Sequence, residues 1–181
     1  PAQRTPRFRE PMISIADRPA EAADRAIPGH WEGDLILGAA GRSAIGTVVE
    51  RASRYLMLVH LPADRTAEAV RDGLIQSLGE LPESLRRSLT WDQGAEMSEH
   101  RSFRMATDMR VYFCDPGAPW QRGTNENTNG LLRQYFPKGT DLSRHSIADL
   151  QAVAEQLNTR PRKTLGWDTP AERLTDLLEH A

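Results

Sequence analysis

The sequence lacks several features that would indicate other classes of protein. Of its 181 residues one is cysteine, so no internal disulfide can form, and a disulfide-stabilised secreted scaffold is excluded. No apolar run approaches the roughly 20 residues that span a bilayer, and the N-terminus lacks the apolar stretch of a secretory signal. We therefore expect a cytoplasmic protein with no membrane partner. Cys114 lies in an apolar run, which favours a buried core residue over a nucleophile.

The chain also has little net charge, −2 at pH 7, which gives no overall indication of a polyanionic partner. The charge is unevenly distributed, because residues 117–163 contain seven basic and four acidic side chains, a local net charge of +3. Such a basic segment suits a phosphate backbone, and on charge alone an ordinary solvated surface explains it equally well.

Three carboxylates stand at positions that suit a metal site. Asp34 directly precedes the apolar run 35–37, where a buried lone carboxylate is costly unless it is paired or binds a metal. Asp92 follows an expected strand and Glu126 lies near an expected helix start, so a turn or a helix terminus also explains either one. Two hard cations about 4 Å apart can serve both oxygens of phosphodiester attack. Together the three acids predict a site for two Mg²⁺ ions, with Mn²⁺ as a substitute.

The spacing of apolar residues predicts strands that are followed by alternating helices and strands. Strands are expected at 35–37, 44–50, 55–61, 88–91 and 111–114. Helices are expected at 67–78, 99–108 and 124–136, then after the cap residues Ser146 and Thr169. Short links favour antiparallel pairing of the first three strands, and intervening helices favour parallel pairing of the last two.

We therefore predict an α/β fold with a five-stranded mixed sheet flanked by helices. Residues 29–181 should form one domain, and residues 1–28, which show no sustained periodicity, an extended arm or linker remnant. In this arrangement Asp34 and Asp92 meet at one edge of the sheet and Glu126 arrives from a helix. Arg133 lies seven residues after Glu126 and shares its helix face.

Four segments resemble the bacterial insertion-sequence transposases of the IS-thirty family, over a region from about residue 20 to the C-terminus. They are residues 29–36 (GHWEGDLI), 89–94 (LTWDQG), 119–130 (PWQRGTNENTNG) and 160–167 (RPRKTLGW). The motifs are long and in the same order, with 33 residues between Asp92 and Glu126. The chain departs from many relatives at Gly117-Ala118 and from some at Ala95, which concerns local substrate contacts and leaves the three acids intact.

The resemblance implies a DDE catalytic core of RNase H-like fold, shared with retroviral integrases, that acts on transposon ends. Asp34, Asp92 and Glu126 match the metal-binding triad, and Arg133 matches a basic residue that such enzymes often carry. Full-length relatives carry an N-terminal helix-turn-helix region that this sequence does not contain, so it resembles an excised catalytic domain.

The expected function is metal-dependent cleavage of transposon-end DNA and transfer of the 3′-hydroxyl end to target DNA. Two alternatives remain at this stage: a nuclease of the same architecture without strand transfer, and a catalytically inactive DNA-binding or assembly module. The expected partner is double-stranded DNA, bound in the nucleoid by a homodimer or higher oligomer. The expected DNA contacts are Arg122, Arg133, Lys138, Arg162 and Lys163 to the backbone and Trp120 to bases.

Overall fold

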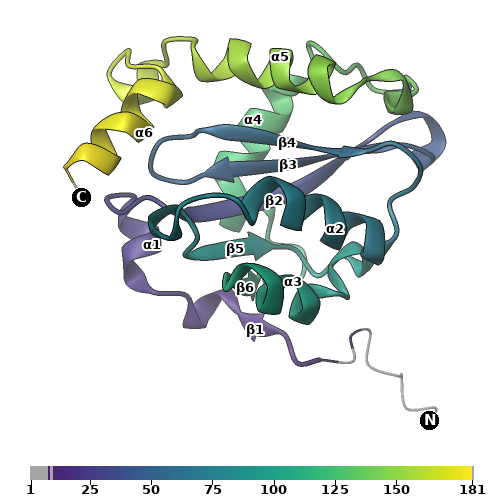
Figure 1. Ribbon diagram of the computed structural model, residues 1–181, viewed down its shortest axis with the longest axis horizontal. Helices are drawn as coiled ribbons and strands as arrows, with labels where there is room; N and C mark the ends of the chain where they lie inside the picture. Colours follow the sequence, from purple (N-terminus) through teal and green to yellow (C-terminus); the bar gives the residue numbers. More distant parts are fainter. Residues whose placement is uncertain (1–7, 9, 181) are drawn as a thin grey trace.

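The computed structural model describes Phe8 and residues 10–180. A six-stranded mixed sheet forms its centre, with helices on both faces (Figure 1). The strands are β1 (Ile13–Ser14), β2 (His30–Leu37), β3 (Ala44–Glu50), β4 (Leu56–Leu61), β5 (Ser88–Trp91) and β6 (Arg110–Phe113). The helices are α1 (Ala20–Asp24), α2 (Ala67–Leu78), α3 (His100–Thr107), α4 (Gly123–Leu132), α5 (Ile147–Asn158) and α6 (Pro170–Glu179). Within this described part, no helix is long and apolar enough to cross a bilayer.

The sheet has the strand order β1-β6-β5-β2-β3-β4. β2, β3 and β4 pair antiparallel, and β5 and β6 pair parallel, as the lengths of the links predict. β5 also pairs parallel with β2, which joins the two groups of strands into one sheet. β3 and β5 have the predicted bounds. β2 begins at His30 rather than Leu35, because its first half pairs with β5 and β3 although its sequence is not an apolar run.

The prediction of five strands is wrong by one, because β1 pairs parallel with β6 through Ile13–Tyr112 and Ser14–Phe113. A two-residue strand is too short to show alternation in the sequence. β1 and α1 both lie in the segment that was expected to form an arm. Residues 1–7 and Arg9 of that segment lie outside the described residues.

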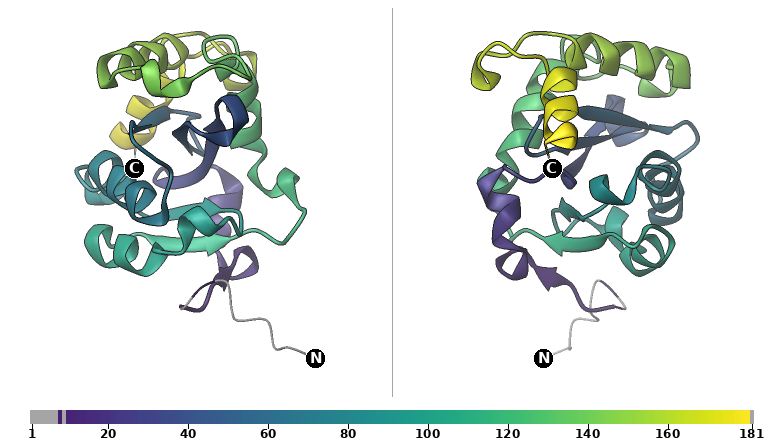
Figure 2. Two further views of the ribbon diagram at one scale, coloured as in Figure 1. Left: turned by 90° about the vertical axis from the view of Figure 1, so that its right-hand side faces the viewer. Right: turned by 60° about the vertical axis from the view of Figure 1, so that its left-hand side comes forward.

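Helices cover both faces of the sheet (Figure 2), and a hydrophobic layer lies between the sheet and the helices on each face. One packs α2 and α3 against it through Val70, Leu74, Leu78 and Phe103. The other packs α4 and α5 against it through Leu132, Leu150, Ala154 and Leu157. Along β2, Trp31 and Leu35 belong to the α2 layer and Ile36 to the α4 layer. Because successive strand residues point to opposite faces, Glu32 and Asp34 face α4.

The start of α4 differs from the prediction. Thr124 was expected to be its N-cap, but Arg122 occupies that position and forms no side-chain cap hydrogen bond. The Thr124 hydroxyl instead accepts a hydrogen bond of 2.6 Å from Arg25 Nη1, within the helix's first turn. The helix also ends at Leu132 and not at Phe136. The other predicted caps are confirmed: the Thr66, Ser146 and Thr169 side chains accept from the first turns of α2, α5 and α6.

Gly33 is required by close packing against Trp91. A Cβ atom at Gly33 would lie 2.1 Å from Cζ3 of the fully buried Trp91 ring. Gly33→Ala is therefore expected to destabilise the protein by about 1–3 kcal/mol, measured by urea unfolding. Gly130→Ala in α4 is the control: its Cβ would meet nothing within 4 Å, so a gain of about 0.5–1 kcal/mol is expected. Equal urea midpoints for Gly33→Ala and the unaltered protein would contradict this packing.

Candidate active site

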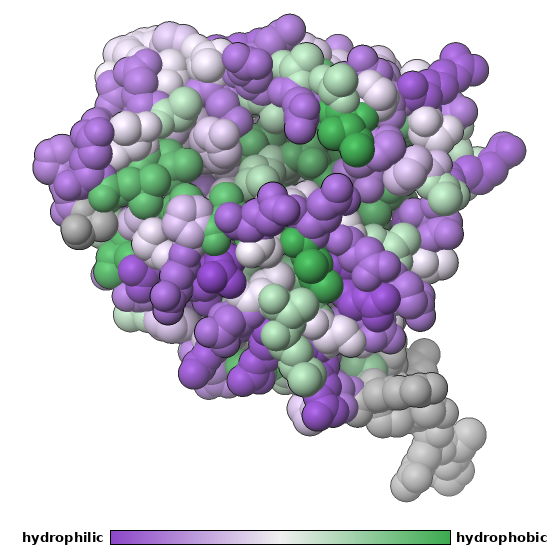
Figure 3. Space-filling model, in the orientation of Figure 1, coloured by the Kyte–Doolittle hydropathy of each residue, from purple (hydrophilic) through white to green (hydrophobic). Residues whose placement is uncertain are grey.

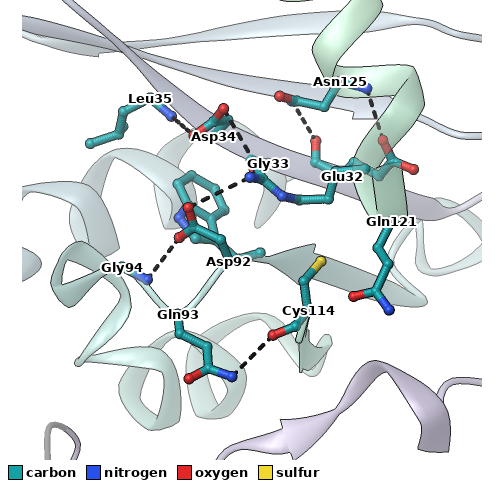
Figure 4. A network of polar contacts seen from close by, with 12 residues as sticks. Glu32, Gly33, Asp34, Leu35, Asp92, Gln93, Gly94, Cys114, Gln121 and Asn125 are labelled. Carbon is teal, nitrogen blue, oxygen red and sulfur yellow. Dashed lines mark hydrogen bonds and ion pairs between the residues drawn. The ribbon is translucent and has the colours of Figure 1, made fainter. Parts of the chain in front are cut away.

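Two of the three predicted carboxylates come together at the edge of the sheet. Asp34 lies in β2 and Asp92 directly follows β5, and these strands are parallel neighbours. The guanidinium of Arg122 bridges them, with Nη1 3.3 Å from Asp34 Oδ2 and Nη2 3.5 Å from Asp92 Oδ2. Figure 4 shows both carboxylates directed toward the same point. The prediction that Asp34 and Asp92 converge is therefore supported by this geometry.

Backbone hydrogen bonds fix the orientation of both carboxylates. Asp34 Oδ1 accepts from the Leu35 N–H at 2.8 Å, and Asp92 Oδ1 accepts from the Gly94 N–H at 2.7 Å. The second oxygen of each, Oδ2, faces the Arg122 guanidinium. Asp92 thus forms a turn, as its alternative interpretation proposed, and still presents an oxygen to a cation.

Burial changes the acidity of Asp34. It raises the pKa of this carboxyl above its ordinary value, while the positive charge of Arg122 and the Leu35 N–H oppose the rise. Arg122 itself is 5% exposed and donates to the Gly33 carbonyl at 3.1 Å. Nearby Cys114 is buried as predicted, and burial raises the pKa of its thiol. A buried thiol with a raised pKa is a poor nucleophile.

Glu126 is on the neighbouring helix but is not assembled with the two aspartates. Its side chain is exposed, and none of the hydrogen bonds or ion pairs among residues 10–180 involves it. Accordingly, no three acidic, histidine or cysteine side chains of the described residues lie as a ready-made metal cluster. Residues three and four apart share a helix face, so Glu126 lies beside Arg122 and Asn129, which both contact Asp34.

The donor set suits a divalent cation. Asp34 and Asp92 offer hard carboxylate oxygens, and a positive guanidinium already lies between them. Asn129 Nδ2 donates to Asp34 Oδ2 at 3.2 Å, while Asn129 Oδ1 is buried with no hydrogen-bond partner in the described structure. Buried amide oxygens are normally paired, so this unpaired oxygen is an acceptor beside Asp34 that no protein group uses in the described structure.

Sequence reasoning assigned no role to Asn129, although it lies three residues after Glu126 in the expected helix. It placed Arg122 among the phosphate contacts, whereas the structure places this side chain between two protein carboxylates. No sequence pattern indicates that pairing, because it depends on how the loop after β6 folds back onto β2 and β5.

The remaining predicted DNA contacts lie on or near the surface. The side chain of Trp120 is 75% exposed, and Lys138 and Lys163 are exposed. Arg162 is half-buried. Arg133 is also half-buried and donates from Nη1 to the carbonyls of Leu37 and Phe136. Its guanidinium is thus held at the end of β2, three residues beyond Asp34.

A separate groove of about 720 Å³ lies between α2, β4 and α5, where hydrophobic side chains gather on the surface (Figure 3). Tyr55, Met57 and Ile147 are among its lining residues, and none of the three predicted acids is. An extended duplex requires an open surface rather than a closed cavity, so the position of this groove does not argue against a site at Asp34.

The fold and the paired carboxylates agree with the family to which the chain belongs. Residues 24–119 match the integrase core domain family, so this protein is a member of it. The match includes Asp34 and Asp92 and ends before Glu126.

Several curated relatives are transposases of insertion sequences. The chain is 56% identical over 167 residues to "Transposase for insertion sequence element IS1086" from Cupriavidus metallidurans, which covers 92% of this chain and 49% of the relative. It is 50% identical over 158 residues to "Transposase InsI for insertion sequence element IS30A" from Escherichia coli, which covers 87% of this chain and 41% of the relative. It is 34% identical over 166 residues to the IS4351 transposase of Bacteroides fragilis, covering 92% and 50%. The chain spans about half the length of these relatives, and a 92% match necessarily includes position 126.

Proposed function

We propose that this chain is the catalytic domain of a DDE transposase that cleaves transposon-end DNA and joins the 3′-hydroxyl end to target DNA. The observation that carries the proposal is the convergence of Asp34 and Asp92 on one positive group at the sheet edge. The similarity to transposases over most of the chain supports it. Three antiparallel strands followed by two parallel ones support the RNase H-like fold that the resemblance implies, with residues 29–181 as its core.

In this proposal Asp34, Asp92 and Glu126 hold two divalent ions, Mg²⁺ or in its place Mn²⁺. The ions supply Lewis acidity to the attacking and leaving oxygens of the phosphodiester. Asp34 and Asp92 offer the ions the Oδ2 atoms that contact Arg122 in the described arrangement, so the Arg122 guanidinium must withdraw. Glu126 is exposed on α4, three residues before the Asn129 that contacts Asp34, and it would have to turn toward Asp34 to complete the ligand set. No protein nucleophile is required.

We propose double-stranded DNA as the partner, with the domain acting as a homodimer or higher oligomer. Arg133, Lys138, Arg162 and Lys163 contact phosphates, and the exposed Trp120 indole stacks on bases.

A strand-transfer assay tests the function. The protein is given Mg²⁺, a transposon-end duplex with a pre-cut 3′-hydroxyl, and a target plasmid. Joined products support a transposase. Cleavage of an uncut end without joining would instead identify a nuclease of the same architecture. Failure of Mn²⁺ to bind in calorimetry, together with DNA binding, would identify a non-catalytic module.

Metal binding should depend on pH because of Asp34. Burial raises the pKa of its carboxyl, so protons compete with the cation at a higher pH than they do at an ordinary aspartate. As the pH decreases, the Mn²⁺ affinity is thus expected to fall at a higher pH than it would for an ordinary aspartate, whose carboxyl titrates at about pH 4. Calorimetric titrations at several pH values measure this. An affinity that stays constant down to about pH 4.5 would contradict the assignment of Asp34 as a ligand.

The DNA contacts should be visible in the salt dependence of binding. Lys163→Ala removes an exposed cation and is expected to reduce the log-log slope of affinity against salt by about one. Arg104→Ala is the matched control, since Arg104 is exposed on α3 at the opposite face of the sheet. Equal slopes for Lys163→Ala and the unaltered protein would remove Lys163 from the contact surface.

A further inference from the structure

α4 begins without an N-cap of its own, although it carries Glu126 in its first turn. The first backbone N–H groups of a helix have no partner within the helix and usually bond to the side chain of the N-cap residue. The N-cap here is Arg122, whose side chain makes no such bond because it reaches Asp34 and Asp92.

A carboxylate from the sheet takes this place. Glu32 Oε2 accepts from the backbone N–H of Asn125 at 2.8 Å, and the Glu32 side chain is completely buried (Figure 4). The Glu32 carbonyl also accepts from Asn125 Nδ2 at 3.2 Å. A negative group at a helix N-terminus is further stabilised by the helix dipole. The residue that Glu32 holds in place directly precedes Glu126.

Glu32 is in turn fixed by Arg51. Its other oxygen, Oε1, forms an ion pair with Arg51 Nη1, and Arg51 is itself 7% exposed. Arg51 Nε donates to the carbonyl of Ala22 at 2.8 Å. Both carboxylate oxygens of Glu32 are therefore used, one by a buried cation and one by α4.

Three consecutive residues of β2 thus bind α4 or the turn before it. Glu32 binds Asn125, the Gly33 carbonyl accepts from Arg122, and Asp34 accepts from Asn129. The strand that carries Asp34 is thus hydrogen-bonded through three successive residues to the helix that carries Glu126 or to the turn before it. Glu32 contributes to these contacts with a completely buried side chain.

We propose that Glu32, held by Arg51, is a positioning residue that sets the position of Glu126 relative to Asp34 by capping α4 from β2. This inference rests on the proposed function, since it assigns Glu32 a role in assembling the metal ligands. Glu32 is not assigned as a ligand, because its side chain is completely buried, whereas those of Asp34 and Asp92 are partly exposed.

The central variant is Glu32→Gln. Glutamine replaces one of the two carboxylate oxygens by a donor nitrogen, so it cannot present an acceptor both at the position that faces Asn125 and at the position that faces Arg51. The matched control is Glu50→Gln, which neutralises another completely buried carboxylate, one that accepts from Gly29 and Ser53 and whose hydrogen bonds among the described residues do not involve α4. If Glu32→Gln does not fold, Glu32→Met combined with Arg51→Met removes the cap without leaving an unpaired buried charge.

Two readouts separate a positioning role from a purely structural one. The first is amide exchange by NMR without metal, in which the Asn125 amide should exchange at least about tenfold faster in Glu32→Gln while the Leu132 amide of α4 is unchanged. The second is Mn²⁺ affinity by calorimetry, which is expected to be about 10–100-fold weaker in Glu32→Gln than in the unaltered protein. The double variant Glu32→Gln/Glu126→Gln should bind Mn²⁺ less than about twofold more weakly than Glu126→Gln alone. Glu50→Gln should change neither quantity.

Unchanged exchange of the Asn125 amide would overturn the proposal. An equal loss of Mn²⁺ affinity with and without Glu126→Gln would overturn it as well, because Glu32 would not then act through Glu126. If the unaltered protein binds no Mn²⁺, the proposed function fails, and the proposal that Glu32 assembles metal ligands falls with it. Accelerated Asn125 exchange in that case leaves Glu32 as the cap of α4 alone, so the two failures are distinguishable.

Discussion

Asp34→Asn is expected to reduce Mg²⁺-dependent cleavage of transposon-end DNA by at least about a thousandfold, since metal ions contribute several kcal/mol to stabilising the transition state. Asparagine keeps the size of the side chain and one oxygen, so the hydrogen bond from Leu35 N–H remains possible. The charge that attracts a cation beside Asp92 is lost. A nicking assay on a labelled duplex under single-turnover conditions measures the effect.

Asp108→Asn is the matched control for this variant. Asp108 is exposed, ends α3 and has a positive φ of 57°, a conformation that asparagine tolerates well. It makes the same change of charge far from β2 and should cleave as the unaltered protein does. If Asp34→Asn is folded and still cleaves at a comparable rate, Asp34 is not a ligand of the catalytic ions.

Arg51→Met is expected to have the largest effect on stability, a loss of about 3–5 kcal/mol, because it leaves the carboxylate of Glu32 buried without its cation. In a domain of this size the melting temperature should fall by roughly 10 °C. Thermal and urea unfolding followed by circular dichroism measure the change.

The double variant Glu32→Met/Arg51→Met provides the comparison. Replacing both partners of a buried ion pair by apolar groups is often neutral, so this variant should be clearly more stable than Arg51→Met. If the losses of stability in the single variants Glu32→Met and Arg51→Met simply add in the double variant, the two side chains are not energetically coupled. Recovery of stability combined with weakened Mn²⁺ binding would indicate that the pair contributes to the site more than to folding.

The strands that could be predicted from sequence are those whose apolar residues form short runs between turns. β3 and β5 match their predicted bounds, and all of their residues are buried. β3 reads as a largely apolar segment, and β5 alternates Leu89 and Trp91 with small polar residues. β1 could not be predicted, because its two residues gain their order from pairing with β6. The N-terminus of α4 was predicted from the cap preference of Thr124, and a tertiary contact with Arg25 overrides that preference.

The candidate site was predictable to the extent that its residues follow from strand topology. Parallel pairing of β2 and β5 brings Asp34 and Asp92 to one edge, which the order of the elements already implies. The bridge made by Arg122 was not predictable, because it depends on the path of an irregular loop. The hydrogen bond between Glu32 and Asn125 was likewise not predictable from the sequence, because it joins residues that are 93 positions apart.

The most direct test of the central claim is a crystal structure of the protein soaked with Mn²⁺, with the ions located by anomalous scattering. We predict two ions, held by carboxylate oxygens of Asp34, Asp92 and Glu126 at ligand distances of about 2.0–2.1 Å, the range of Mg²⁺ sites. The Arg122 guanidinium should have withdrawn from between Asp34 and Asp92. A fully soaked crystal in which Arg122 still bridges the two aspartates, with no anomalous peak beside them, would contradict the account.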